Sequence, residues 1–313
     1  MRVAGTSYTE SMVEQMNLLA SQQYQLQNQA STGQRVQAPS DDPAAMQQAL
    51  ILQAQNSSAS QYAQNISTLQ TGATAVGSVL QQLQTVTNRV SEIAAQVGGA
   101  TSPDAMQSYG AEVTQLIQQA AQLLNTKNGD QYLFSGTASD QPPFVVATDA
   151  GGNVTGVTYQ GNTGAAQSEI GENSTIAVGV PGENNTGTGP RGLVSDNRYG
   201  ADLFNHLISL QNDLQAGNAN AVSTTDQQAL SKDQDNLVYQ VANNGAVQAR
   251  LDAASTAAGA TQTSLQQSLN TVAGADLTQT LASLTQANTA YQVALQSSST
   301  ILQLQQSLLS YLP

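Results

Sequence analysis

Three groups of residues have types and spacing that could do chemistry, and the first is a glycine-rich run. Gly187, Gly189 and Gly192 satisfy the GxGxxG pattern that can hold a phosphate. A dinucleotide site needs these glycines between a buried strand and the N-terminus of a helix. Here they follow Asn184-Asn185-Thr186 and enclose Pro190, so the sequence predicts a flexible loop and no nucleotide cofactor.

The second group is the acidic pair in Ser40-Asp41-Asp42-Pro43, which could be read as a general acid and base. Adjacent side chains rarely face each other, however, and both acids precede a proline. Ser40 or Asp42 followed by Pro43 is typical of a helix N-cap with proline in the first turn. We therefore predict that Ser40, Asp41, Asp42 and Pro43 form a link and helix cap.

The third candidate is the single histidine, His206, which could join a serine and an aspartate in a triad. It lies in an amphipathic segment without identified partners, so we expect an ordinary histidine. The chain has no cysteine, which excludes disulfides, thiol nucleophiles and Cys-based zinc sites. We expect no catalytic residue, no metal site and no cofactor.

Composition and charge narrow the function classes further. With 8 basic and 21 acidic residues, the 313-residue chain has a net charge of -13, and its basic residues are scattered. A nucleic-acid partner is therefore not expected. The sequence also has no 18-residue apolar stretch and no apolar run behind a basic N-terminal segment, so we expect neither a membrane span nor a cleaved signal peptide.

A shift in composition divides the chain into three parts. Residues 1–133 and 201–313 are rich in Ala, Gln and Leu, whereas 134–200 concentrate Gly, Pro, Thr and Val. We predict a mainly α fold, in which N- and C-terminal arms form a long antiparallel helical bundle or coiled coil that carries a small β-rich inserted domain. The expected domains are 1–43 plus 273–313 for assembly, 44–133 plus 201–272 as a helical bundle, and 134–200 as a surface insert.

Heptad repeats carry the prediction of helices in both arms. The N-terminal seam is Met12, Met16, Leu19, Gln23, Leu26 and Ala30, and a longer one runs from Tyr62 to Val97. The C-terminal seam is Leu277, Leu281, Leu284, Asn288, Tyr291, Leu295, Ser298, Leu302, Gln305 and Leu309. We expect the two terminal seams to pair within one chain and then to pack against copies, because 251–313 contain no Lys or Arg to oppose side-by-side packing.

The insert alternates apolar and polar residues at 144–146, 154–159 and 175–180, between glycine-rich turns. This pattern predicts short antiparallel strands that close on themselves around a thin core.

The stretch LQNQASTGQRVQAPSDDPAA, residues 26–45, resembles the N-terminal signature of the flagellin superfamily. There a first helix is followed by Ser/Thr-Gly, a basic residue, an extended link and Asp-Asp. Residues 276–313 resemble the superfamily's terminal helix, and Tyr132-Leu133-Phe134-Ser135-Gly136 is more similar to its hook–filament junction members than to flagellin. The resemblance covers the two arms and extends only loosely to the insert.

This resemblance implies an extracellular structural protein of the bacterial flagellum, exported unfolded by the flagellar type III pathway. Its implied partners are copies of itself in a ring, hook-associated protein 1, flagellin and an export chaperone. The implied assembly interface is Met12, Met16, Leu19, Leu26, Leu277, Leu281, Leu284, Tyr291, Leu295, Leu302 and Leu309. Two alternatives stay open: a filament subunit of the same class, and a secreted adhesin or enzyme module carried on the insert.

Overall fold

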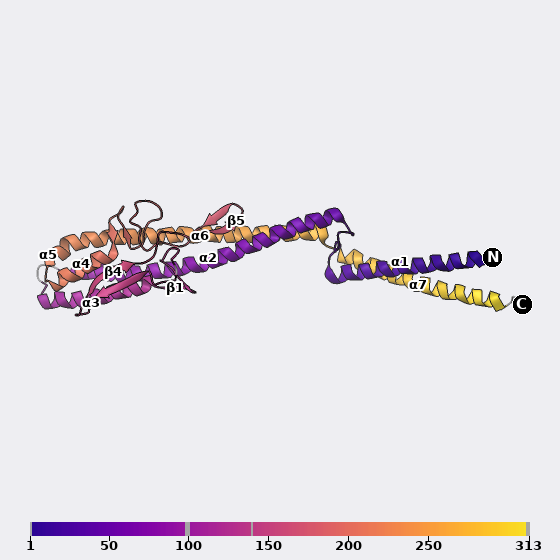
Figure 1. The fold of residues 1–313 in the computed structure, drawn as a ribbon, viewed down its shortest axis with the longest axis horizontal. Coiled ribbons are helices and arrows are strands. Elements are labelled where there is room, and N and C mark those ends of the chain that lie inside the picture. Colours follow the sequence, from indigo (N-terminus) through magenta and orange to yellow (C-terminus); the bar gives the residue numbers. More distant parts are fainter. Residues whose placement is uncertain (1, 98–100, 139, 311–313) are drawn as a thin grey trace. The chain divides into compact units, whose positions relative to one another are not determined.

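The computed structural model of the chain describes residues 2–97, 101–138 and 140–310, and within these ranges the side chains of 10–304 (Figure 1). The α-helices are α1 (Arg2–Thr32), α2 (Pro43–Gln96), α3 (Pro103–Leu124), α4 (Leu203–Gln215), α5 (Ala219–Ala221), α6 (Gln227–Ala273) and α7 (Leu277–Ser310), with a π-helical turn at Val222–Asp226. The strands are β1 (Lys127–Asn128), β2 (Gln131–Tyr132), β3 (Phe144–Thr148), β4 (Val154–Tyr159), β5 (Ser168–Gly171), β6 (Ser174–Ile176), β7 (Ser195–Asp196) and β8 (Ala201–Asp202). The mainly α class, with small antiparallel strand pairs in the inserted region, is confirmed.

The helices end at local sequence signals. Gly33 follows α1 at φ +69° and donates its N–H to the carbonyl of Gln29, a helix ending that glycine adopts without steric cost. Ser102 accepts a hydrogen bond from the N–H of Ala105, and Pro103 then opens α3. None of the described helices is both long and apolar enough to cross a membrane.

Contacts along the chain define two compact units. One comprises residues 1–59 and 260–313, and the other comprises 60–259. Both units draw on α2 and α6, because these two helices each contain residues of both ranges.

The unit formed by 60–259 has one main apolar core. Buried side chains of α2, α3, α4 and α6 meet there, and among its fully buried residues are Leu80, Ile117 and Leu207. A second cluster packs Ile170 and Ile176, from the β5–β6 pair, against apolar residues of α2 and α6. Figure 1 labels β5 beside α6.

The insert differs from the expectation of strands closed on themselves. Its strands form separate two-stranded sheets, β3 with β4 and β5 with β6, and neither sheet pairs with the other. The apolar residues of the insert enter the helical core instead of a core of their own: Phe134, Phe144, Val154, Val180, Leu193 and Val194. Two strands bury too little surface to be stable alone, so the helices supply the missing burial.

Three amide side chains anchor the insert to the helices: the half-buried Asn125 and the buried Gln211 and Asn236. Asn125, at the end of α3, donates to the carbonyl of Phe144 at 2.7 Å and accepts from its N–H at 2.9 Å. Gln211 of α4 makes the same two-way contact with the backbone of Val154, at 3.1 and 3.2 Å. Asn236 of α6 donates to two carbonyls of the 192–193 segment. Such pairs satisfy the strand backbone as a neighbouring strand would.

Candidate assembly surface

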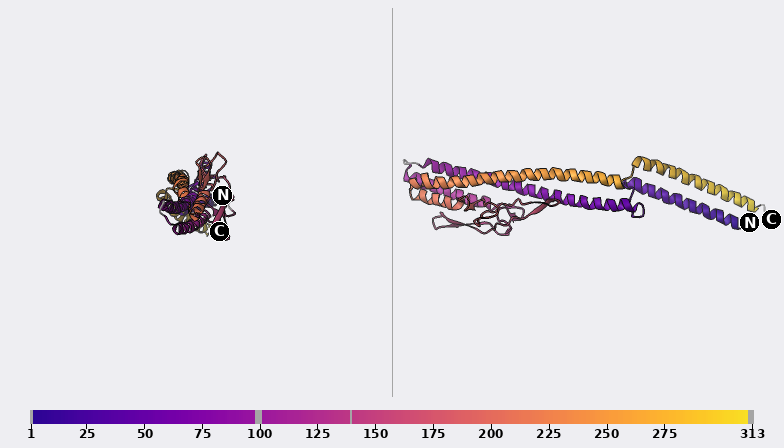
Figure 2. Two further views of the ribbon diagram at one scale, coloured as in Figure 1. Left: turned by 90° about the vertical axis from the view of Figure 1, so that its left-hand side faces the viewer. Right: turned by 90° about the horizontal axis from the view of Figure 1, so that it is seen from above.

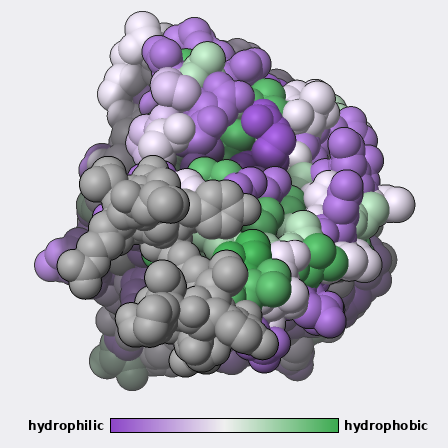
Figure 3. Space-filling model, turned by 90° about the vertical axis from the view of Figure 1, so that its right-hand side faces the viewer, coloured by the Kyte–Doolittle hydropathy of each residue, from purple (hydrophilic) through white to green (hydrophobic). Residues whose placement is uncertain are grey.

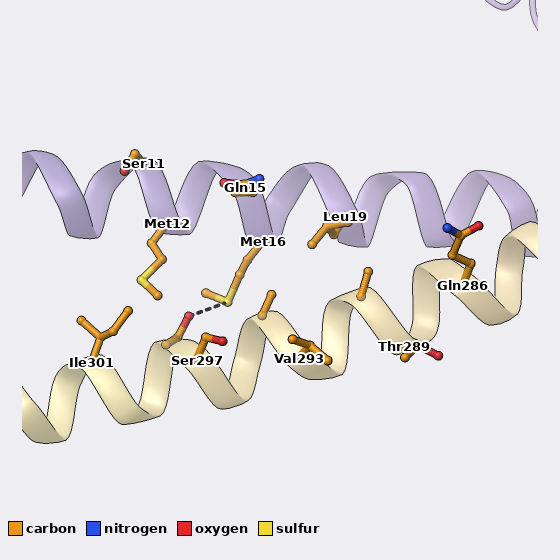
Figure 4. Close-up of a pocket in the computed structure, with 13 residues that line it drawn as sticks. Ser11, Met12, Gln15, Met16, Leu19, Gln286, Thr289, Val293, Ser297 and Ile301 are labelled. Carbon is orange, nitrogen blue, oxygen red and sulfur yellow. Dashed lines mark hydrogen bonds between the residues drawn. The ribbon is translucent and has the colours of Figure 1, made fainter.

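Helices α1 and α7 lie side by side and antiparallel, with both chain termini at the same end (Figures 1 and 2). Near one end of the pair, Gln23 donates a hydrogen bond through Nε2 to Oδ1 of Asn288. Towards the termini, the hydroxyl of Ser298 lies 3.7 Å from the sulfur of Met16, as the dashed line in Figure 4 marks. These two contacts fix the register of the pair.

On α1, the side facing α7 is the heptad seam expected from the sequence. Met12, Met16, Leu19, Gln23, Leu26 and Ala30 are all half-buried, while most residues between them are exposed. The predicted interface residues Met12, Met16, Leu19 and Leu26 therefore lie together on one face.

On α7, the side facing α1 is shifted by one residue from the seam of leucines. The half-buried or buried residues at heptad spacing are Thr280, Leu284, Ala287, Tyr291, Ala294, Ser298 and Ile301. Leu284, Tyr291 and Ser298 belong to both series. The expectation that the other leucines of α7 pair with α1 is wrong, because Thr280, Ala294 and Ile301 occupy the positions next to three of them on the contact side.

Four of the predicted interface leucines are exposed as a result. They are Leu277 (48%), Leu281 (54%), Leu295 (44%) and Leu302 (56%). Leu309 lies outside the residues whose side chains the structure describes. The series 280–284–287–291–294–298–301 also has heptad spacing in the sequence. Leucine is more apolar than alanine or serine, so the periodicity favours the seam of leucines as the contact face.

A groove runs between α1 and α7 and encloses about 710 Å³. Figure 4 shows Met12, Met16 and Leu19 pointing from α1 towards α7 and Ile301 pointing back from α7, and Val293 also lines the groove. Seen from the end that carries the termini, green apolar residues surface among purple polar ones (Figure 3). The exposed large apolar side chains of α1 and α7 include Leu18, Tyr24, Leu281 and Leu302.

The link between α1 and α2 is held by charged side chains. The guanidinium of Arg35 lies 3.3 Å from Oδ2 of Asp42 and donates to the carbonyl of Val272, at the end of α6, at 2.9 Å. Oδ1 of Asp42 accepts from the N–H of Ala45 at 3.0 Å, so this aspartate caps α2. Arg35 thus ties the 33–42 link to the segment that joins α6 to α7.

Asp41 holds the same link from within. Its Oδ2 accepts from the N–H groups of Gln37 and Ala38, at 3.0 and 2.9 Å. These hydrogen bonds lower the pKa of Asp41, and the N–H of Ala45 likewise lowers the pKa of Asp42. Both carboxylates are therefore acceptors in a turn and show no acid/base pairing. Ser40 and Pro43 are exposed, and Pro43 is the first residue of α2.

The other candidates from the sequence have structural roles. The 187–192 run is a loop, and Asn184 donates through Nδ2 to the carbonyls of Thr188 and Pro190 within it. Nδ1 of His206 lies 2.8 Å from Oδ2 of Asp233, and this hydrogen bond raises the pKa of the histidine. The pair joins α4 to α6.

One buried carboxylate near this pair is incompletely satisfied. Oδ1 of Asp226, in the π-helical turn, accepts from the hydroxyl of Ser209 at 3.1 Å, whereas Oδ2 has no hydrogen-bond partner. Burial, with the nearby charge of Asp213 as a smaller cause, raises the pKa of Asp226 to about 6. Across the described ranges, no three His, Asp or Glu side chains gather in a way that could hold a metal ion.

Both helical arms match one protein family. Residues 6–139 match the bacterial flagellin N-terminal helical region, and residues 227–312 match the bacterial flagellin C-terminal helical region. Together the two ranges cover more than half of the chain. The chain belongs to the bacterial flagellin family.

Within that family the similar proteins are hook-associated proteins. Flagellar hook-associated protein 3 of Salmonella typhimurium is 31% identical over 159 residues, 50% of this chain and 48% of that protein. Its Escherichia coli namesake is 34% identical over 118 residues, 37% of each chain. The aligned stretches thus span about half or less of these relatives.

A solved structure of a flagellar hook-associated protein from Vibrio parahaemolyticus has the same fold. It superimposes with a TM-score of 0.63 at 18% identity, over 74% of this chain and 99% of that one. The relatives named above are structural flagellar proteins and not enzymes.

Proposed function

We propose that this chain is a junction adaptor between the flagellar hook and the filament. Copies would assemble into a ring through α1 and α7, with hook-associated protein 1 on one axial side and flagellin on the other. The protein would act outside the cell, after export with the help of a chaperone. Its similarity to proteins named hook-associated protein 3 supports the junction role over that of a filament subunit.

The observation that carries the proposal is the exposed leucine stripe of α7. The side chains of Leu277, Leu281, Leu295 and Leu302 are each about half exposed. They lie on a helix that has no charged residue between 277 and 310. Apolar patches of this kind mark interaction sites in soluble proteins. Contact with neighbouring copies would bury them.

The proposed division of labour follows the three parts of the chain. Residues 1–43 with 273–313 would form the assembly region, and 44–133 with 201–272 would form the outer wall of the tube. Residues 134–200 would lie at its surface. The anchoring of the insert on α3, α4 and α6 supports a fixed position on that wall.

Immunogold labelling of isolated flagella tests the junction role directly. We expect a band at the end of the hook and no label along the filament. Label along the whole filament would identify a flagellin instead, and purified chain that grows long filaments on seeding would agree with that outcome. The absence of label from the whole flagellum would overturn both the junction role and the flagellin alternative.

The alternative of a secreted adhesin or enzyme module carried on the insert has less support. Within the described part of the insert, the acids Asp140, Asp149, Glu169, Glu172 and Glu183 form no cluster that could hold a metal ion. Burial raises the pKa of Glu183 to about 7, but a single perturbed acid without a partner does not define a reaction.

A further inference from the structure

The α1–α7 pair has two different apolar flanks, and they lie on opposite sides. We name the leucine ridge Leu281, Leu295 and Leu302, each one residue after an α1-facing position. The groove residues of α7, Gln286, Val293 and Ser297, each lie one residue before such a position. One residue is about 100° of helix rotation, so the ridge and the groove point in opposite directions from the line of contact.

Side chains of α1 extend both flanks in the same way. Val13 and Tyr24, 51% and 70% exposed, follow the seam residues Met12 and Gln23 and therefore lie on the flank of the ridge. Met12 and Met16 line the groove on the other flank. Both flanks thus carry exposed apolar side chains in the single chain, and on the groove side these lie among polar ones such as Gln286 and Ser297.

We propose that the leucine ridge of one copy occupies the α1–α7 groove of the next copy. This rests on the proposed assembly role and specifies its partner. A contact between two unlike surfaces is heterologous, and it continues from copy to copy until a ring closes or a helix grows. A pair of identical surfaces would instead stop at a dimer.

The spacing and chemistry of the two surfaces support this pairing. Ridge residues 281, 295 and 302 and groove residues 286 and 293 follow the same seven-residue period, as knobs and holes of packed helices do. The methionines of the groove are flexible and can adapt to a branched side chain. Because α7 carries no charge between 277 and 310, nothing in it selects a charged partner over another copy.

The absence of cysteine allows a direct test on the full chain. Leu295→Cys marks the ridge and Val293→Cys marks the groove, two residues apart on exposed positions of one helix. Gln296→Cys, on the exposed side away from α1, is the matched control. Purified chains are concentrated, mixed in pairs with a tag on one partner, and oxidised to disulfides, which form only between close Cβ atoms.

We expect the mixture of Leu295→Cys and Val293→Cys to give at least fivefold more cross-linked dimer than either variant alone or any mixture with Gln296→Cys. Strong cross-linking of Leu295→Cys with itself would mean ridge-to-ridge packing and would overturn the proposal. So would the lack of a ridge-to-groove product both in concentrated protein and in isolated flagella. Immunogold labelling tests the junction role separately. The cross-linking experiment can therefore contradict the ridge-to-groove contact without contradicting the junction role, and the reverse.

Discussion

At the scale of single residues, polar side chains hold this chain together where apolar contacts are few. Asp42 caps α2 and meets Arg35, which in turn reaches the carbonyl of Val272. Asn125 and Gln211 pair with strand backbones. In a sequence so rich in amides these residues look like surface positions, and nothing local distinguishes the buried ones from the rest.

Two substitutions at Asp42 separate its cap from its ion pair. We expect Asp42→Ala to speed hydrogen exchange at the Ala45 amide strongly, because the acceptor is lost. Asp42→Asn keeps a good capping oxygen and loses only an exposed ion pair, so exchange should stay close to wild type. Asp130→Ala, an exposed acid in another turn, is the control. Equal loss of protection in both Asp42 variants would contradict the cap.

The link between α1 and α2 should lose stability at low pH. Because accepted N–H groups lower the pKa of Asp41 and Asp42, their stabilisation is complete above the ordinary carboxyl pKa of about 4 and is lost as pH falls through the lowered values. Exchange at residues 37, 38 and 45, corrected for its intrinsic pH dependence, should rise below about pH 4. At Ala45 it should not rise in Asp42→Asn, which has no proton to gain at this position.

Asp226 gives a stability prediction of opposite sign. Its raised pKa, about 6, means that the folded state loses stability as pH rises from about 4 through about 6, where the buried carboxyl ionises beside Asp213. Asp226→Asn should therefore raise the free energy of unfolding by about 1–3 kcal/mol at pH 8, and the melting temperature with it. At pH 4 the melting temperature should stay nearly unchanged. Asp235 is exposed on α6, so Asp235→Asn should leave the melting temperature unchanged at both pH values. A variant that melts lower than wild type at pH 8 would show that the charge is well satisfied.

At the scale of elements, heptad spacing predicts the long helices well, because it extends over many turns. The six seam residues expected on α1 are all half-buried, and most residues between them are exposed. The contact face of α7 is not, since Thr280, Ala287 and Ala294 become the inner face only when α1, some 270 residues earlier in the sequence, packs against them. Two-residue strands such as β7 and β8 have no periodicity to detect.

A charge on the leucine ridge should abolish assembly and leave the single chain folded. Leu295 is 44% exposed, so Leu295→Asp costs the monomer little, whereas burial of the carboxylate against another copy is strongly unfavourable. Helix content by circular dichroism should match wild type, while cells make hooks without filaments and secrete the monomer. Gln296→Asp places the same charge on the far side of α7 and should retain motility. Normal motility with Leu295→Asp would remove the ridge from the interface.

The insert should not be separable from the helices that carry it. Replacement of 138–194 by a short Gly/Ser linker removes Phe144, Val154 and Leu193 from the main core, so we expect a large fall in melting temperature. Replacement of the exposed turn 149–152 by Asn-Gly keeps these residues and should have little effect. An unchanged melting curve after the larger deletion would mean that the helices close their own core.

At the scale of the whole molecule, the two units differ in how much they bury. The unit formed by 60–259 contains most of the fully buried leucines, isoleucines and phenylalanines, whereas the contact between α1 and α7 is made by half-buried and small side chains. The heptad pattern predicts this pairing of the ends. It does not predict how thin the contact is, because that depends on which face of α7 is turned inward.

The thin contact predicts that the ends gain their stability on assembly. In the free chain, amides of residues 10–32 and 277–304 should exchange much faster than those around Leu80 and Leu207, because little apolar surface offsets the entropy of ordering these helices. Hydrogen exchange followed by mass spectrometry, on monomer and on assembled flagella, measures both states. Strong protection across Leu281–Leu302 in the monomer would show that the ends are stable before they meet a partner.

The amide anchors have a consequence for how such proteins diverge. Asn125 and Gln211 bond to main-chain atoms of Phe144 and Val154, and every amino acid except proline offers the same N–H and C=O groups. These hydrogen bonds between helices and strands therefore place no demand on the outward side chains of β3 and β4, which can change while the helices keep hold of the strand backbone. The family match stops at residue 139 and resumes at residue 227, on either side of the part held in this way.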